Sequence, residues 1–138
     1  MIFAYTRAQA IEDGVLIDLT EWARETSFKV PVACTSEVWH RYITPPAGTR
    51  EFGQSERGRA HDTLWMLFVA IKRRSSDNQL NSRTDGGKGE ARRGNDQLLY
   101  EVIFLQAPQH HETIQLKSIC GPGDNGEPVI TIMLPNED

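Results

Sequence analysis

Three short apolar runs near the end of the printed sequence predict the sheet. Residues 98–105 (LLYEVIFL) and 129–134 (VITIML) are rich in β-branched and aromatic side chains, and residues 113–120 (TIQLKSIC) alternate between apolar and polar positions. Runs of this length and composition are typical of β-strands. Residues 121–128 between the last two runs combine glycine, proline, aspartate and asparagine, which favour a tight turn. The pattern predicts an antiparallel three-stranded meander.

The N-terminal half is predicted to form short helices with clear start and stop signals. Thr6 and Gln9 have the spacing of a capping box, and Gly14 is a suitable stop for the helix that they open. A second helix is expected to begin within residues 18–21, where Asp, Thr and Glu precede a tryptophan.

Two extended segments and a third helix are expected between these helices and the middle of the chain. Residues 15–19 (VLIDL) read as a short strand that could pair with an edge of the C-terminal sheet. Residues 28–33 contain Pro31, which favours an edge strand or a linker over a central strand. A third helix is expected to begin at a cap within residues 35–36 and to end before the prolines at 45–46.

The longest helix is predicted to run from Ser55 to about Arg74. Its apolar residues recur at i, i+4 and i+7, with further apolar residues that widen the stripe. Such a stripe is expected to pack across the sheet. The predicted contacts join Leu64, Trp65, Phe68 and Ile71 of the helix to Val102, Phe104, Ile114, Leu116, Ile130 and Ile132 of the strands.

Residues 75–97 have a different composition from their surroundings. This segment contains no aromatic residue and only one large aliphatic residue, Leu80. It can bury too little apolar surface to offset its ordering entropy, so a flexible polar loop is expected there. The whole chain of 138 residues has the size of one domain. We therefore expect a single α+β domain over residues 1–138, with a three-stranded C-terminal sheet, or four strands if residues 15–19 join it.

Charge is unevenly distributed along the chain. The formal net charge is −4, yet residues 72–93 hold seven basic and three acidic side chains. A net acidic chain is unlike a simple basic nucleic-acid-binding protein, although direct nucleic-acid contact through the basic segment stays open as an alternative. The segregation predicts two electrostatic partner-binding regions, one basic and one acidic. Their candidate residues are Arg73, Arg74, Arg92 and Arg93, and Asp124 and Glu127.

Cysteine usage and hydropathy indicate the compartment. Cys34 and Cys120 lie in separate apolar segments without CxxC spacing, so two reduced thiols are expected, with a disulfide or a reactive cysteine as the alternatives. The first seven residues lack the pattern of a signal peptide, and no apolar run reaches the roughly 20 residues of a membrane span. A cytoplasmic protein is expected.

No catalytic, metal or cofactor motif is present in the sequence. The potential catalytic side chains are scattered, and no HExxH, GxSxG, Walker-type loop or paired CxxC occurs. These side chains are Cys34, His40, His61, Asp62, His110, His111 and Cys120. Non-enzymatic binding is therefore favoured, with no cofactor. The alternative is a small hydrolase-like enzyme whose site lies between the helices and the C-terminal hairpin, around His61, Asp62 and Asp124.

Four segments resemble a family of small uncharacterised proteins carried on bacterial plasmids, prophages and other mobile elements. They are AIEDGVLIDLTEWA (10–23), PVACTSEVW (31–39), DTLWMLFVAIKR (62–73) and LKSICGPGDNGEPVITIMLPNED (116–138). The family has no established activity that could be transferred to a residue. The resemblance implies a genetic context in which small proteins often act in counter-defence, as anti-CRISPR or anti-restriction inhibitors of a host protein or nucleoprotein complex. This step is an association.

Overall fold

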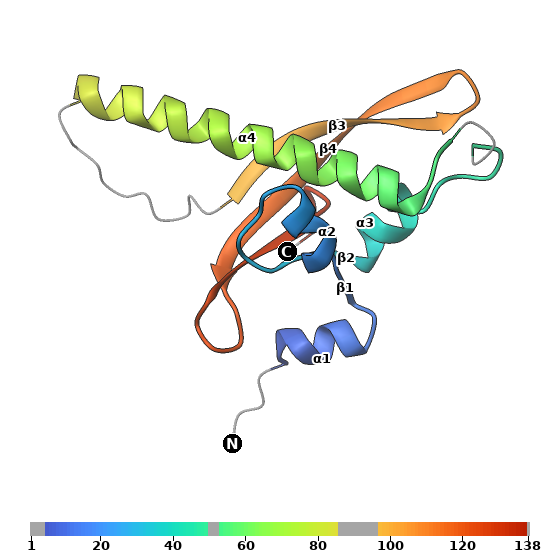
Figure 1. Cartoon of the computed structure of the whole chain (residues 1–138), viewed down its shortest axis with the longest axis horizontal. Helices are drawn as coiled ribbons and strands as arrows, with labels where there is room; N and C mark the ends of the chain where they lie inside the picture. The colour runs from blue at the N-terminus through green and yellow to red at the C-terminus, as the bar shows by residue number, and fades with distance from the viewer. Residues whose placement is uncertain (1–4, 50–52, 86–96, 138) are drawn as a thin grey trace.

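A five-stranded sheet organises the molecule in the computed structural model, which describes residues 5–49, 53–85 and 97–137 (Figure 1). The strands follow the spatial order β1-β2-β5-β4-β3, and only β2 and β5 run parallel. Their bounds are Leu16–Asp18 (β1), Val32–Thr35 (β2), Gln97–Ala107 (β3), His110–Pro122 (β4) and Pro128–Met133 (β5). The predicted α+β class and the C-terminal meander are confirmed, but the prediction of three or four strands is wrong.

The error in strand number arises at β2. Residues 28–33 were expected to form an edge strand or a linker because of Pro31, yet β2 lies between β1 and β5. Pro31 lies just before this strand, where its lack of an N–H group leaves no gap in the ladder. Its carbonyl oxygen accepts a hydrogen bond of 2.9 Å from the main-chain N–H of Ile130. The proline therefore contributes to the pairing of β2 with β5.

Short helices surround the N-terminal strands. They are α1 (Arg7–Glu12), α2 (Thr20–Glu25), α3 (Ser36–Val38) and a π-helical turn, η1 (Trp39–Ile43). The capping box predicted at Thr6 and Gln9 is present. Gly14 follows α1 with a φ of 82°, a conformation that glycine adopts without strain. The Thr35 hydroxyl caps α3 by accepting a hydrogen bond from the Val38 N–H.

The long helix α4 (Glu56–Asp85) begins where it was predicted and ends eleven residues later than expected. The Ser55 hydroxyl accepts a hydrogen bond of 3.0 Å from the Gly58 N–H at its start. Residues 75–85 contain neither glycine nor proline, so nothing in the backbone stops the helix after Arg74. The rest of the predicted loop, 86–96, lies outside the described residues.

The core lies between α4, the sheet and the short helices. Leu64 and Leu67 are completely buried on α4, and all six strand residues of the predicted packing belong to the core cluster. Phe68 and Ile71 are partly buried against it. Trp65 was predicted to join this core but is 48% exposed. It follows Leu64 by one position, about 100° around the helix, which turns it out of the buried face of α4.

Candidate partner-binding site

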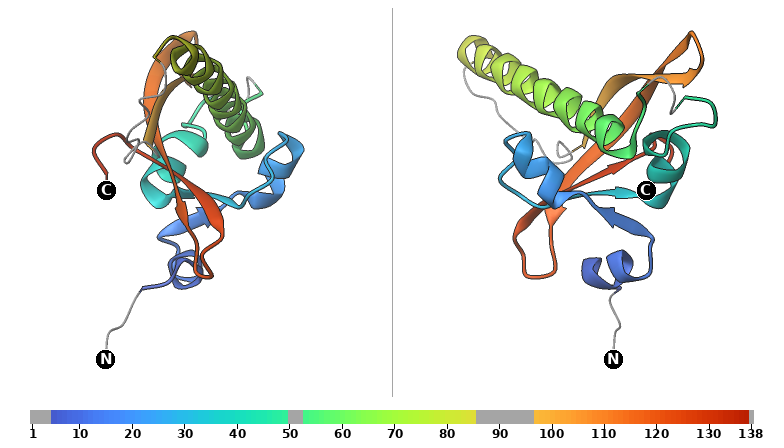
Figure 2. Two further views of the ribbon diagram at one scale, coloured as in Figure 1. Left: turned by 90° about the vertical axis from the view of Figure 1, so that its left-hand side faces the viewer. Right: turned by 45° about the vertical axis from the view of Figure 1, so that its right-hand side comes forward.

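β3 is one of the two edge strands of the described sheet, and its outer edge lies beside α4. In the described sheet, β3 pairs with β4 on one side and with no strand on the other (Figures 1 and 2). The main-chain carbonyls of Gln97 and Leu105 accept hydrogen bonds from arginines of α4. In an antiparallel pair, alternate residues direct both peptide groups to the same side. The odd-numbered residues of β3 therefore direct their N–H and C=O groups away from β4.

Two arginines of α4 lie at the two ends of this edge. Arg59 donates to the carbonyl of Leu105 at 2.8 Å, and Arg74 donates to the carbonyl of Gln97 at 2.8 Å. The helix consequently runs antiparallel to β3 and alongside it. Between the two contacts, Leu99, Glu101 and Ile103 are the odd-numbered residues that remain.

Arg59 is buried, although it is a charged residue. Its side chain is 1% exposed and donates to the carbonyl of Tyr42 and to the side-chain oxygens of Gln54 and Gln106, besides Leu105. The guanidinium also lies 4.5 Å from the ring centroid of Phe104. Burial lowers the pKa of Arg59, and the charge of Asp62 acts in the opposite direction. Arg59 therefore connects α4, the π-helical turn and the end of β3.

Exposed apolar side chains gather beside the open edge. Trp65, Leu99 and Ile103 are 48%, 53% and 61% exposed, respectively. They are three of the five large hydrophobic residues that the described chain leaves exposed; the other two, Tyr5 and Val15, lie near α1. Concentration of exposed apolar residues in one area is characteristic of a binding surface, whereas single exposed residues are ordinary.

Two adjoining cavities separate α4 from β3, and we refer to them together as the edge groove. The first has a volume of about 320 Å³, the second about 640 Å³, and Met66 and Glu101 line both. The first cavity is lined by Asp62, Trp65, Met66, Glu101, Val102, Ile103 and Thr113. The second is lined by Met66, Val69, Ala70, Arg73, Arg74, Leu98, Leu99, Tyr100, Glu101 and Gln115. The groove thus has apolar walls, with Asp62 in the first cavity, Arg73 and Arg74 in the second, and Glu101 shared by both.

The predicted basic region is divided by the structure. Arg73 and Arg74 both line the edge groove, where Arg74 also contacts the main chain of β3. Arg92 and Arg93 lie outside the described residues. The two described arginines are therefore part of a groove whose other members the charge pattern did not indicate.

The residues of the predicted acidic region make structural contacts within the chain. The Asp124 carboxylate accepts hydrogen bonds from the main-chain N–H groups of Arg7 at 2.8 Å and Ala8 at 3.1 Å, which are the first two residues of α1. Glu127 accepts a hydrogen bond of 2.9 Å from the Asn125 N–H within the turn. Figure 2 shows this turn and α1 at the same end of the molecule. Asp124 thus stabilises the start of α1.

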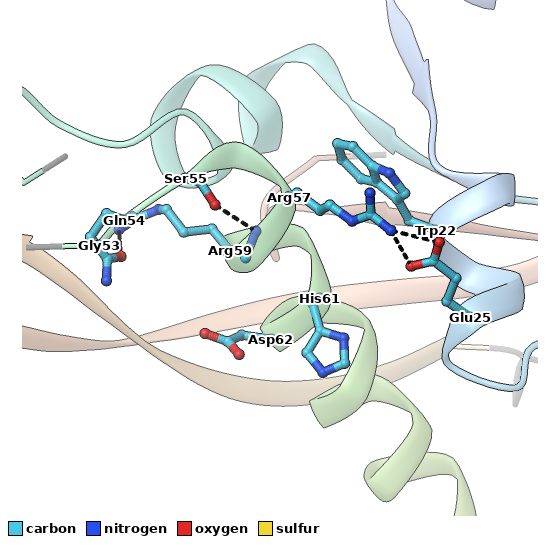
Figure 3. A pocket seen from close by; sticks show the side chains of 10 residues that line it. Trp22, Glu25, Gly53, Gln54, Ser55, Arg57, Arg59, His61 and Asp62 are labelled. Carbon is cyan, nitrogen blue, oxygen red and sulfur yellow. Dashed lines mark hydrogen bonds and ion pairs between the residues drawn. The ribbon is translucent and has the colours of Figure 1, made fainter.

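A third cavity, of about 480 Å³, lies beside the start of α4 (Figure 3). His61 and Asp62 line it together with Trp22 and an exposed ion pair, in which Arg57 lies 2.7 Å from Glu25. Partial burial raises the pKa of the Asp62 carboxyl, while His61 and Arg59 oppose the increase. The hydrolase-like alternative required Asp124 as well, but that residue does not line the cavity.

The remaining candidate catalytic side chains are not assembled with this cavity. Cys34 is buried, and burial raises the pKa of its thiol to about 12, so it carries no thiolate at neutral pH. Cys120, His40, His110 and His111 are exposed. Within the part of the chain that the structure describes, no three His, Cys, Asp or Glu side chains group as metal ligands would.

Sequence reasoning missed the members of the edge groove on β3. Leu99, Glu101 and Ile103 lie in a run that is apolar on both faces, a pattern that usually marks a strand covered on both sides. The available signal was the single charge, Glu101, in the middle of that run. Its meaning depended on β3 being an edge strand, which only the strand order reveals.

Comparison with known proteins identifies a family but no activity. Of the helices in the described ranges, none combines the length and the apolar character that crossing a membrane requires. No curated protein and no solved structure matched the chain. A family model described as a family of unknown function matched residues 1–138. The chain therefore belongs to the family of unknown function DUF6573.

Proposed function

We propose that this protein is a non-enzymatic binding protein and that it recognises a partner protein through the edge groove. The observation that carries the proposal is the concentration of Trp65, Leu99 and Ile103 around the edge of β3, which pairs with no strand within the described residues. Apolar and aromatic side chains that are surrounded by polar residues are typical of the centres of protein interfaces. Asp62, Glu101 and Arg73, which line the same groove, supply the polar surround.

The biological setting that we propose is counter-defence in bacteria. The resemblance to proteins of mobile elements supports this setting, and the partner would then be a host protein or a host nucleoprotein complex. An inhibitor of this kind needs a surface that binds a partner tightly, and it needs no catalytic centre. Arg73, which is exposed in the groove, would add a contact to a nucleic-acid component.

The experiment that tests the proposal is a comparative capture of proteins from bacterial lysate. The immobilised parent chain is compared with Leu99→Thr/Ile103→Thr, which removes apolar surface and places a residue of high β-propensity at both positions. Val15→Thr is the matched control, because Val15 is 49% exposed and belongs to the other exposed apolar group. We expect a stoichiometric partner that the parent and the control retain and that the double variant loses. Equal capture by all three proteins would refute the proposal.

A further inference from the structure

We infer that the edge groove accepts an extended segment of its partner as a sixth strand of the sheet, with a basic residue of that segment opposite Glu101. This inference rests on the proposed function and specifies the chemistry of the partner. Addition of a strand to an exposed sheet edge is a common mode of peptide recognition, in which main-chain hydrogen bonds provide affinity and alternate side chains provide specificity.

The main chain of β3 has the groups that such a strand requires. Along a strand, every second residue directs its peptide groups to the same side. Leu99, Glu101 and Ile103 therefore direct their N–H and C=O groups to the outer edge, as Gln97 and Leu105 do. The carbonyls of Gln97 and Leu105 are already bonded to arginines, so they limit the open stretch. About seven residues of an incoming strand fit between them at about 3.3 Å per residue.

The side chains of β3 determine which residues fit. In an antiparallel pair, residues directly opposite one another have side chains on the same face. Residues opposite Leu99 and Ile103 should therefore be apolar, and the residue opposite Glu101 should be lysine or arginine. The two residues between these positions would face the apolar wall of the groove that Met66, Val69 and Ala70 form. The expected pattern is apolar, small, basic, small, apolar.

A second copy of the chain fits this edge poorly. The symmetric antiparallel register that pairs Leu99 with Ile103 also places Glu101 opposite Glu101. Like charges that are directly opposed destabilise a strand pair. Asp62, which lines the same cavity as Glu101, adds a further negative charge. The charge pattern therefore disfavours self-pairing and favours a basic segment from another protein.

The probe for this inference is the acetylated and amidated peptide Ser-Thr-Val-Ala-Lys-Ala-Val-Thr-Ser, added to the full chain. Its sequence reads the same in both directions, so its lysine is central in either orientation. Amide hydrogen exchange should show new protection at Leu99, Glu101 and Ile103. Tyr100 and Val102 serve as internal references. Their peptide groups face β4 because they alternate with the outward-facing residues, so their exchange rates should not change.

Two matched changes test the mode of binding. In the antiparallel pairing that places the lysine opposite Glu101, N-methylation of the central lysine removes a hydrogen bond to β3 and should abolish binding, while N-methylation of the adjacent alanines should not. Glu101→Lys, at an exposed position, should weaken binding of the lysine peptide at least about tenfold and should restore binding to the peptide with a central glutamate. Equal effects of both N-methylations, or no charge preference, would overturn the inference.

The outcomes also separate this inference from the proposed function. If lysate capture depends on Leu99 and Ile103 but the peptide neither binds nor protects β3, the groove binds its partner in another way and the inference is wrong. If capture fails and the peptide also fails, both are wrong. Protection of Leu99, Glu101 and Ile103 in the protein alone would mean that the edge is already occupied. If this protection rises with protein concentration, the occupant is a second copy, and if it does not, the occupant is the chain itself. Either result would overturn the inference.

Discussion

Replacing Arg59 by methionine should destabilise the fold, because the guanidinium serves four acceptors while the residue itself is only 1% exposed. Arg59→Met preserves most of the apolar contact with Phe104 but removes every donor. The side-chain amides of Gln54 and Gln106 can reorient, whereas the main-chain carbonyls of Tyr42 and Leu105 cannot. An unsatisfied buried acceptor costs about 1–3 kcal/mol.

The expected loss for Arg59→Met is therefore about 2–4 kcal/mol, since the two carbonyls lose their donor while the cost of burying the guanidinium is recovered. Arg59→Lys retains the charge but lacks the planar set of donors that reaches several acceptors, so it should fall between the parent and Arg59→Met. Unfolding in urea measures both variants. With a slope of about 2 kcal/mol per molar for a small domain, the midpoint should fall by about 1–2 M.

Arg57→Met provides the matched control for this measurement. Arg57 lies two residues away on the same helix, and its ion pair with Glu25 joins side chains that are 64% and 56% exposed. Exposed pairs of this kind contribute about 0–1 kcal/mol, so the control should unfold close to the parent. If Arg59→Met were also within about 0.5 kcal/mol of the parent, a range ordinary for surface substitutions, the reasoning about buried acceptors would be refuted.

Three further predictions concern other parts of the structure. Asp124→Ala should lower the free energy of unfolding by about 1 kcal/mol, as loss of a helix cap does, and should accelerate amide hydrogen exchange in α1. The control Glu127→Gln should leave exchange in α1 unchanged, and equal exchange in both variants would contradict the capping role. Phe68→Ala should cost less than the 3–5 kcal/mol or so of a fully buried phenylalanine, because Phe68 is only partly buried. A loss of that size or larger in urea unfolding would contradict this prediction. In the native protein at pH 8, Ellman's reagent should modify the exposed Cys120 rapidly and leave Cys34 protected, because burial raises the pKa of the Cys34 thiol to about 12; two rapidly reacting thiols would disprove this assignment.

Local signals predicted the elements of this fold well. The capping box at Thr6, the stop at Gly14 and the cap at Ser55 each depend on a few neighbouring residues, and each occurs as expected. The sheet order depends on contacts between distant segments, and here prediction failed. Pro31 was interpreted from its own segment, which gives no indication that β5 accepts β2 as a parallel neighbour.

The candidate site could be predicted only in part for the same reason. Arg73 and Arg74 stood out by charge and do line the edge groove. Asp124 also stood out by charge, but its carboxylate bonds α1, a contact that spans more than a hundred residues. Ile103 gave no signal, because an apolar residue in an apolar strand indicates a binding surface only after the strand is known to lie at an edge.

The position of β5 has a consequence for how the chain folds. Its parallel partner β2 pairs Val32 with Ile130, so the two strands close a chain segment of nearly a hundred residues. In the described sheet, β5 is also the strand that joins the β1-β2 pair to the β3-β4 hairpin. During synthesis, the N-terminal strands must wait for β5 before they can enter the sheet, and contacts this distant in sequence form slowly. A nascent chain that stops before β5 should therefore hold two separate β-ribbons, each with exposed edges that invite aggregation.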